Sequence, residues 1–478
     1  MTRETTNGAP AHPSSFKQSI GLLDGTMLVA GSMIGSGIFL VSANITQHVG
    51  SAGWLILTWA LTGFMTLAAA VSYGELSGMF PKAGGQYVYL REAYNPLIGF
   101  LFGWSFFGVV QTGTIAAVAV AFGIYAGYLM PGLDTVLVHV GSVNITGQSL
   151  LALGVVILLT YVNTRGVKEG KFIQTTFTVI KLLSLFGLIV LGLLLAARGS
   201  IWHANWQEGW KFRQYDSGTG IWQSVGFMVG LGAMSAAMVG SLFSSDAWNN
   251  ITFVAGEIKR PERNIGLSLV FGTLIVSVIY VCANLMYVSV LSMKDIAFAP
   301  HSRVAVAAAE KIFPGLGGII IAVMIMISTF GCINGLILSG ARVYYTMAQD
   351  KLFFRRTGDL NRNAVPGYAL WIQCIWTCLL CLSGSYNALL TYVISVVLIF
   401  YVLTLIGIFV LRYRRPDMPR PYKAFGYPYL PIIYCLLATT VTICLFVYQW
   451  STTWPGALIV VSGIPIYYLA VRNRSASV

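Results

Sequence analysis

Charged residues are scarce in this chain of 478 residues. Asp, Glu, Lys and Arg together make up 9% of the sequence, whereas they make up about 25% of a typical soluble domain. This scarcity excludes a water-soluble globular protein. Long apolar runs, each near the length of about 20 residues that crosses a bilayer as a helix, predict twelve transmembrane helices at 22–48, 54–79, 97–130, 149–163, 172–197, 221–256, 266–291, 315–348, 367–383, 387–411, 429–448 and 455–471.

The sequence also lacks the motifs of several function classes. It contains no H-E-x-x-H, no G-x-S-x-G and no G-x-x-x-x-G-K-[ST], and its five histidines lie outside the predicted spans or at their edges. All seven cysteines fall inside predicted spans, which leaves none for a loop disulfide. We therefore expect no enzyme activity, no cofactor and no metal site.

The basic residues are unevenly distributed between the two sides of the predicted helices. Most of the 29 Lys and Arg fall in connections on the same side as the N-terminus. Because cytoplasmic loops retain Lys and Arg, both termini are predicted to be cytoplasmic, as expected for a multi-pass protein of the cell (inner) membrane. The first apolar run has no small-residue cleavage pattern after it, so we expect it to remain as a helix. Basic residues spread over many short loops also argue against a nucleic-acid partner.

The first predicted span is interrupted near its middle. Residues 31–37 read Gly-Ser-Met-Ile-Gly-Ser-Gly, and each glycine lowers helix stability by about 1 kcal/mol relative to alanine. Irregular backbone at membrane depth persists only where protein or a polar cavity supplies hydrogen-bond partners. Close helix packing through Gly31-x-x-x-Gly35 is the alternative interpretation, but packing alone does not require the additional Ser36 and Gly37.

The sixth predicted span has a similar interruption. Residues 240–250 contain three serines and Asp246, and the apolar run from Ile221 to Gly256 is longer than one crossing requires. Two half-helices joined by unwound chain would explain both features. The two interrupted spans are the first and the sixth, so each would be the first helix of a set of five. This correspondence indicates a transporter built from inverted repeats, although no residue-level repeat is visible.

These two interruptions predict a site for a zwitterion. A half-helix that begins at Gly35–Gly37 presents unpaired N–H groups and a positive dipole end to an anion. The carbonyl groups left by the breaks, near Met33 and from Phe243 to Asp246, suit a cation. A carboxylate and an ammonium separated by one carbon describe an α-amino acid.

Four motifs also resemble the amino acid/polyamine/organocation (APC) permease superfamily, and within it the L-type amino acid transporter group with its bacterial relatives. The resemblance runs through nearly the whole chain. The motifs are Gly31–Phe39, Tyr73–Leu76 with Pro81–Tyr89, Phe243–Asn249, and Arg420–Lys423 through Pro428.

This resemblance implies an all-α, LeuT-like fold of two inverted five-helix repeats plus two extra helices, with helices 1 and 6 broken. The expected divisions are a cytoplasmic tail at 1–20, helices 1–5 at 21–199, helices 6–10 at 200–411, helices 11–12 at 412–471, and a second cytoplasmic tail at 472–478. The implied function is transport of L-amino acids by alternating access around a central site.

The resemblance also implies roles for particular residues. The carboxylate is expected on the backbone of Ser36 and Gly37, the ammonium on carbonyl groups around Met33, Phe243, Ser244 and Asp246, and an aromatic lid at Phe243. The full set expected to bind substrate is Ser32, Met33, Ile34, Gly35, Ser36, Gly37, Phe243, Ser244, Asp246, Trp248 and Asn249. Gln111 and Thr112 are further candidates for the side-chain subsite.

Two departures from the family pattern are informative. Eukaryotic light chains have glycine where Asp246 stands, so this carboxylate either contacts a cation or points away from the substrate. The connection from Pro131 to Gln148 lacks the cysteine that links those light chains to a glycoprotein. We therefore expect no disulfide-linked heavy chain, and a monomer or weak homodimer.

Two further charges lie at informative positions. Lys181 lies ten residues after Lys171, about 15 Å along a helix and thus near the bilayer centre. The resemblance places it where sodium-coupled relatives bind an ion, which argues against sodium coupling. A permanently charged Lys181 indicates exchange or facilitated transport, whereas a Lys181 that loses its proton indicates proton symport; a purely structural cation is the third interpretation. Glu75, near the cytoplasmic end of helix 2, is expected to stabilise that end. A receptor that binds amino acids without moving them is the alternative from another function class.

Overall fold

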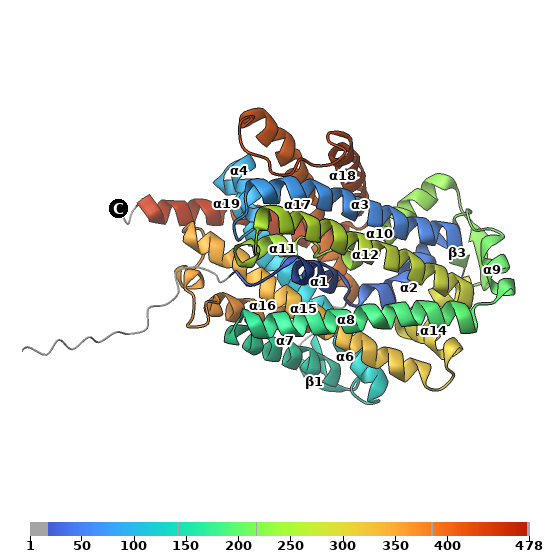
Figure 1. The fold of residues 1–478 in the computed structure, drawn as a ribbon. Helices are drawn as coiled ribbons and strands as arrows, with labels where there is room; N and C mark the ends of the chain where they lie inside the picture. Colours follow the sequence, from blue (N-terminus) through green and yellow to red (C-terminus); the bar gives the residue numbers. More distant parts are fainter. Residues whose placement is uncertain (1–17, 141–142, 217, 384–385, 476–478) are drawn as a thin grey trace, which may run out of the picture.

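The computed structural model describes residues 18–140, 143–216, 218–383 and 386–475, which are mainly helical (Figure 1). The elements up to residue 216 are α1 (Leu22–Met33), α2 (Gly37–Val49), α3 (Ala52–Met79), α4 (Gln86–Ala93), α5 (Pro96–Ser105), the π-helix η1 (Phe106–Val110), α6 (Gln111–Leu129), β1 (Val136–Val140), β2 (Val143–Thr146), α7 (Gly147–Arg165), α8 (Val167–Leu191), the π-helix η2 (Gly192–Ala196), α9 (Gly199–Trp206) and β3 (Arg213–Asp216). The remaining elements are β4 (Ile221–Ser224), α10 (Phe227–Ser244), α11 (Asn250–Phe253), the 3₁₀-helix η3 (Ala255–Glu257), α12 (Pro261–Val290), α13 (Met293–Ala297), the 3₁₀-helix η4 (Pro300–Ser302), α14 (Val304–Ile312), α15 (Gly317–Gln349), the 3₁₀-helix η5 (Arg355–Gly358), α16 (Gly367–Ser383), α17 (Tyr386–Arg414), α18 (Tyr429–Tyr448) and α19 (Trp450–Ser475).

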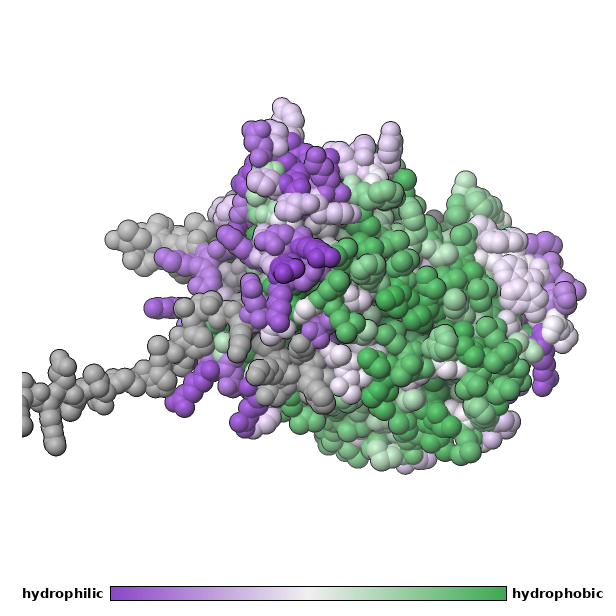
Figure 2. Space-filling view, in the orientation of Figure 1, coloured by the Kyte–Doolittle hydropathy of each residue, from purple (hydrophilic) through white to green (hydrophobic). Residues whose placement is uncertain are grey.

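The protein is a multi-pass integral membrane protein. Among the described residues, nine helices are long and apolar enough to cross a membrane, and α1 with α2, bent by 41° at the break between them, make up to ten. Two shorter apolar stretches, Gly367–Leu382 and Thr453–Leu469, lie in α16 and α19. Figure 2 shows the resulting surface, a broad hydrophobic band with hydrophilic residues gathered at its ends.

The sixth predicted span begins later than the sequence suggested. Ile221–Ser224 forms strand β4, which pairs with β3 in an antiparallel hairpin, and α10 starts only at Phe227. Trp222 packs edge-on against Tyr215, with ring centroids 5.3 Å apart. The apolar side chains at the start of the run are therefore used in a hairpin, and the prediction of one apolar run from Ile221 was wrong at that end.

The first two helices lie at the centre of the bundle. α1 packs against α8, α12 and α15, while α2 packs against α3 and α10. Nearly all side chains of α1 and α2 after Asp24 are buried. The break between α1 and α2 is consequently enclosed by long helices from both halves of the chain.

Candidate functional site

The centre of the site is the break in the first span. α1 ends at Met33 and α2 begins at Gly37, with Ile34 to Ser36 outside either helix. The N–H of Gly35 donates to the carbonyl of Met33 at 2.8 Å instead of continuing the helix. The first N–H groups of α2 have no acceptor inside their own helix, so this end presents hydrogen-bond donors and a positive dipole end.

Lys181 of α8 binds the carbonyl groups at the end of α1. Its fully buried ammonium donates to Gly31 O and Ile34 O, each at 2.7 Å. The sequence placed Lys181 near the middle of the bilayer and allowed a partnership with Asp246 or with backbone carbonyls; the structure has the carbonyls. The ammonium thus fixes the end of α1 to α8.

Two side chains of α15 bind the same turn. Cys332 donates its thiol to Ser32 O at 3.0 Å, and Ser328 donates its hydroxyl to Ile34 O at 3.2 Å. Together with Lys181 they supply the donors that the missing helical N–H groups would have provided. The turn is therefore fixed by two different helices, α8 and α15.

Tyr280 of α12 joins this break to the second one. Its buried hydroxyl lies 3.1 Å from Met33 O at the end of α1 and 3.0 Å from Ser244 O at the end of α10. Gly37, the first residue of α2, also touches Ser244, because a Cβ built on Gly37 would overlap the Ser244 side chain and lie 3.0 Å from its Cα. The two breaks are thus in direct contact.

The chain after α10 runs through five residues outside either helix, 245–249, and then forms only the short α11. Ala247 has a left-handed backbone with φ of 63°. The Asp246 carboxylate accepts a hydrogen bond of 2.5 Å from the hydroxyl of Tyr401 on α17. The carboxylate therefore has a partner on a different helix.

Trp248 and Asn249 lie on the side of the break that faces α3, α4 and α17. Trp248 is buried against Tyr73 and Tyr401, with ring centroids 4.7 and 5.4 Å away. Asn249 donates to Gln86 at 3.0 Å, and Gln86 donates to Thr404 at 3.0 Å. These contacts connect the unwound chain to the motif that begins α4.

The remaining expected residues are divided between the centre and its surroundings. Phe243 is buried in the last turn of α10, next to the contact with α2. The Ser32 hydroxyl is buried and has no hydrogen-bond partner in the described part of the chain. Gln111 donates to Leu336 O on α15 at 2.6 Å, while Thr112 donates to Phe107 O on the adjoining π-helix η1 at 2.7 Å. Gln111 thus faces α15, and Thr112 has its hydroxyl engaged locally.

Sequence reasoning missed four partners at the breaks, namely Tyr280, Ser328, Cys332 and Tyr401. Each lies in a long apolar helix, where an isolated tyrosine, serine or cysteine is ordinary core. No sequence pattern distinguishes them from their neighbours. Only their contacts with α1, α10 and the chain after α10 reveal that they bind the backbone and side chains at the breaks.

Glu75 stabilises the end of α3, as the sequence predicted. Its buried carboxylate accepts two hydrogen bonds from the Arg412 guanidinium, at 2.9 and 2.7 Å, and one from the backbone N–H of Ala424 at 2.7 Å. A second buried ion pair joins Glu257 to Arg342 at 2.9 Å. Both pairs connect distant parts of the chain near the ends of long helices.

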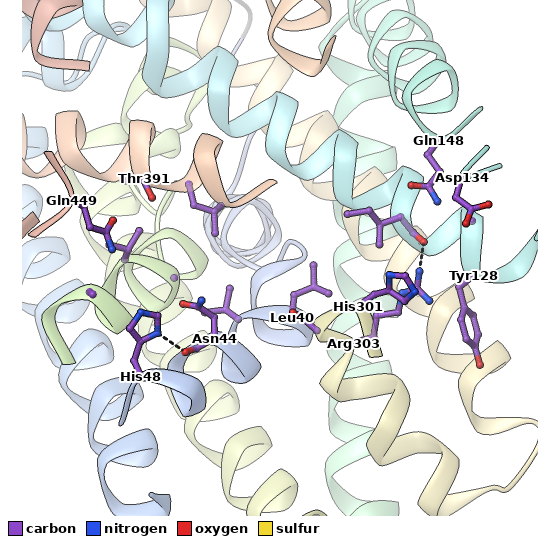
Figure 3. A pocket seen from close by; sticks show the side chains of 18 residues that line it. Leu40, Asn44, His48, Tyr128, Asp134, Gln148, His301, Arg303, Thr391 and Gln449 are labelled. Atoms are coloured by element: carbon purple, nitrogen blue, oxygen red, sulfur yellow. Dashed lines mark hydrogen bonds between the residues drawn. The ribbon is translucent and has the colours of Figure 1, made fainter. Parts of the chain in front are cut away.

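A cavity of about 650 Å³ lies one helical turn from the breaks (Figure 3). Leu40 and Val41 of α2 and Val239 and Gly240 of α10 form the part of its wall nearest to the site. These residues directly follow the start of α2 and precede the end of α10. The cavity therefore ends about one helical turn short of the place where the two breaks meet.

Known proteins resemble this chain over almost its whole length. A family model described as amino acid permease matches residues 20–471. The serine/threonine exchanger SteT of Bacillus subtilis (strain 168) is 30% identical over 468 residues, which cover 97% of this chain and 99% of the relative. The large neutral amino acids transporter small subunit 2 of Homo sapiens is 28% identical over 459 residues, covering 96% and 81%. The b(0,+)-type amino acid transporter 1 of Mus musculus is 26% identical over 482 residues, covering 98% and 91%.

Proposed function

The chain belongs to the amino acid permease family, whose members are transporters rather than enzymes, and from this premise we propose that it carries L-amino acids across the membrane by sodium-independent alternating access. The central site would lie where the two breaks meet. The α-carboxylate would bind the N–H groups at Ser36 and Gly37, and the α-ammonium would bind the carbonyl groups of Met33, Phe243 and Ser244.

The proposal rests mainly on the position of the Tyr280 hydroxyl. It lies within hydrogen-bond distance of a carbonyl from each break, at 3.1 Å from Met33 O and 3.0 Å from Ser244 O. A carbonyl oxygen has two lone pairs, so Ser244 O can accept a further donor such as an ammonium. Met33 O also accepts the N–H of Gly35 at 2.8 Å, so an ammonium would replace one of its two donors. The donor end of α2 begins beside them. N–H donors at the start of α2 therefore lie beside carbonyl acceptors at the ends of α1 and α10, and this arrangement suits a zwitterion.

Other expected residues would act around this centre. Ser32, Ile34 and Gly35 would hold the shape of the turn, and Asp246, bound to Tyr401, would act from outside the direct contacts. Trp248 and Asn249 would form the side-chain subsite together with the helices that they contact.

The position of Lys181 supports independence from sodium. An ammonium already lies between Gly31 O and Ile34 O, 2.7 Å from each, and backbone carbonyls of this kind are the ligands that a sodium ion would need. We propose exchange or facilitated transport, with Lys181 as a tethered cation. Proton symport through Lys181 is the alternative, because a buried lysine can release its proton when its surroundings change.

We further propose that the twelve predicted spans form two inverted repeats of five helices followed by two more. The breaks after Met33 and Ser244 lie in the first helix of each repeat, which supports this arrangement. The bias of Lys and Arg toward one side supports cytoplasmic termini in an inner membrane. The absence of cysteine from the connection 131–148 supports action without a disulfide-linked partner.

Uptake into proteoliposomes tests these proposals together. Labelled amino acids would be offered with sodium or choline outside, with or without amino acid inside, and with or without an inward proton gradient. Stimulation by internal amino acid alone supports exchange, and stimulation by the proton gradient supports symport. Binding of labelled amino acid without any accumulation would indicate a receptor and contradict transport.

A further inference from the structure

The cavity beside the breaks contains an unusual pair of opposite charges at one end. Arg303, in the connection before α14, and Asp134, in the connection after α6, both line it, and Figure 3 shows them on the same side of the cavity as Tyr128 and Gln148. The opposite end is lined by uncharged groups and His48, whose ring bonds Asn44 O at 2.8 Å. The charges are thus concentrated at the end of the cavity away from His48.

Arg303 has hydrogen-bonding capacity to spare. One of its terminal nitrogens donates to Ile124 O at 3.1 Å, and the guanidinium lies over the ring of Tyr128, 5.2 Å from the centroid. Its Nε is buried and has no hydrogen-bond partner among the residues that the structure describes. Burial lowers the pKa of this guanidinium below its usual value. A negatively charged ligand would compensate for the water that the guanidinium has lost.

Asp134 is close to Arg303 but does not neutralise it. The charge of Asp134 favours the guanidinium form of Arg303, yet the two side chains form no ion pair among the residues that the structure describes. Asp134 lies at an exposed position. A positive and a negative group therefore line one cavity without being paired to each other.

The chain before Arg303 is held in a strained conformation against the cavity. His301 and Ser302 have left-handed backbones, with φ of 52° and 59°, and both line the cavity. Non-glycine residues in this region persist only where the surrounding structure holds them. The position of Arg303 is therefore fixed by its own segment and not only by its contact with α6.

We propose that this cavity holds an outer docking site for an amino acid zwitterion, with the α-carboxylate on Arg303 and the α-ammonium toward Asp134. The site rests on the proposed transport function and precedes the central site on the path of the substrate. A free anion would be repelled by Asp134 and a free cation by Arg303. A molecule that carries both charges, separated by one carbon, satisfies both groups at once.

Exchange measured from each side of the membrane tests the docking site. Right-side-out and inverted vesicles containing the full chain would be compared, each with saturating amino acid on the opposite side. Arg303→Gln should raise the KM for external amino acid about tenfold, the loss expected when a charge-assisted hydrogen bond is removed. The internal KM and the maximal rate should not change. Asp134→Asn, at an exposed position, should change the external KM in the same direction.

Lys311→Gln is the matched control, because it removes a cation on α14 that does not line this cavity. It should leave both KM values unchanged. If Arg303→Gln does not fold, Arg303→Lys and Asp134→Asn provide the same comparison. An unchanged external KM, or an equal rise on both sides, would overturn the docking site while leaving the proposed function intact. A wild-type chain that exchanges no amino acid would overturn the proposed function itself.

Discussion

Replacing Lys181 by methionine removes the ammonium while keeping most of the stem volume. The structure shows which groups lose a partner. Ile34 O keeps one donor, the hydroxyl of Ser328 at 3.2 Å. Gly31 O keeps no donor among the described residues, because the N–H of Gly35, which would bond it in a continuous helix, donates to Met33 O instead. One buried carbonyl at the end of α1 is therefore left unsatisfied.

The size of the effect follows from this loss. Two charge-assisted hydrogen bonds contribute about 1.5 to 3 kcal/mol each, but burying an ammonium costs several kcal/mol, so the two terms largely cancel for global stability. The local term remains, because an unsatisfied buried carbonyl costs about 1 to 3 kcal/mol. A shift of that size changes an equilibrium between two arrangements about 5- to 150-fold. We expect the Lys181→Met variant to fold and bind amino acid, but to turn over far more slowly.

Proteoliposome exchange and equilibrium binding of a labelled amino acid separate the two roles of Lys181. If the ammonium only fixes α1, turnover falls with no change in its pH profile. If Lys181 carries the proton, the variant loses stimulation by an inward proton gradient and keeps counterflow exchange. Ser184→Ala is the control, since the Ser184 hydroxyl bonds Ile180 O in the same helix, at 2.7 Å, and is not bound to the end of α1 among the described residues. Normal transport by Lys181→Met would show that the lysine is a structural charge and would refute the reasoning.

Three further predictions concern the same centre. Replacing sodium by choline should leave uptake unchanged, and a clear sodium dependence measured in proteoliposomes would contradict the role given to Lys181. Gly37→Val should abolish binding while leaving membrane insertion intact, because its side chain would overlap Ser244 and crowd the N–H groups of α2. Equilibrium binding of a labelled amino acid to the purified variant checks this. Wild-type affinity would show that residues 31–37 only pack helices together and do not bind the substrate. Tyr280→Phe should weaken binding about fivefold, the effect of losing one hydrogen bond of about 1 kcal/mol. Unchanged affinity in the same assay would show that Tyr280 does not contribute to the binding site.

The helix ends at Met33 and Ser244 were accessible from the sequence, because they depend on local composition. Glycine and serine are dense at residues 31–37, and serine and aspartate interrupt the run at 240–250. The structure ends α1 at Met33 and α10 at Ser244, inside those two segments. Helix propensity acts over a few residues, so one sequence is enough to detect where it fails.

The partners of the breaks were not accessible, because they depend on how distant helices pack. Cys332 is 300 residues from the carbonyl that it binds, and Tyr280 is 247 residues from Met33. The hairpin at 213–224 was missed for a related reason. Ile221 and Trp222 raise the local hydropathy as a membrane helix would, and only the pairing with β3 distinguishes the two. Contacts with other parts of the chain decide whether such a segment forms a strand or a helix.

The contacts at the two breaks imply that they cannot move independently. The end of α1 is bound by α8, α12 and α15, and the end of α10 shares Tyr280 of α12 with it. The Tyr280 hydroxyl has one hydrogen to donate, so a tilt of α1 that lengthens the bond to Met33 O leaves that hydrogen to Ser244 O alone. A substrate that binds the same carbonyls would compete with or reinforce this hydroxyl. The occupancy of the site and the angle between the half-helices are thus linked through one side chain, which is the physical requirement for coupling binding to a change of access.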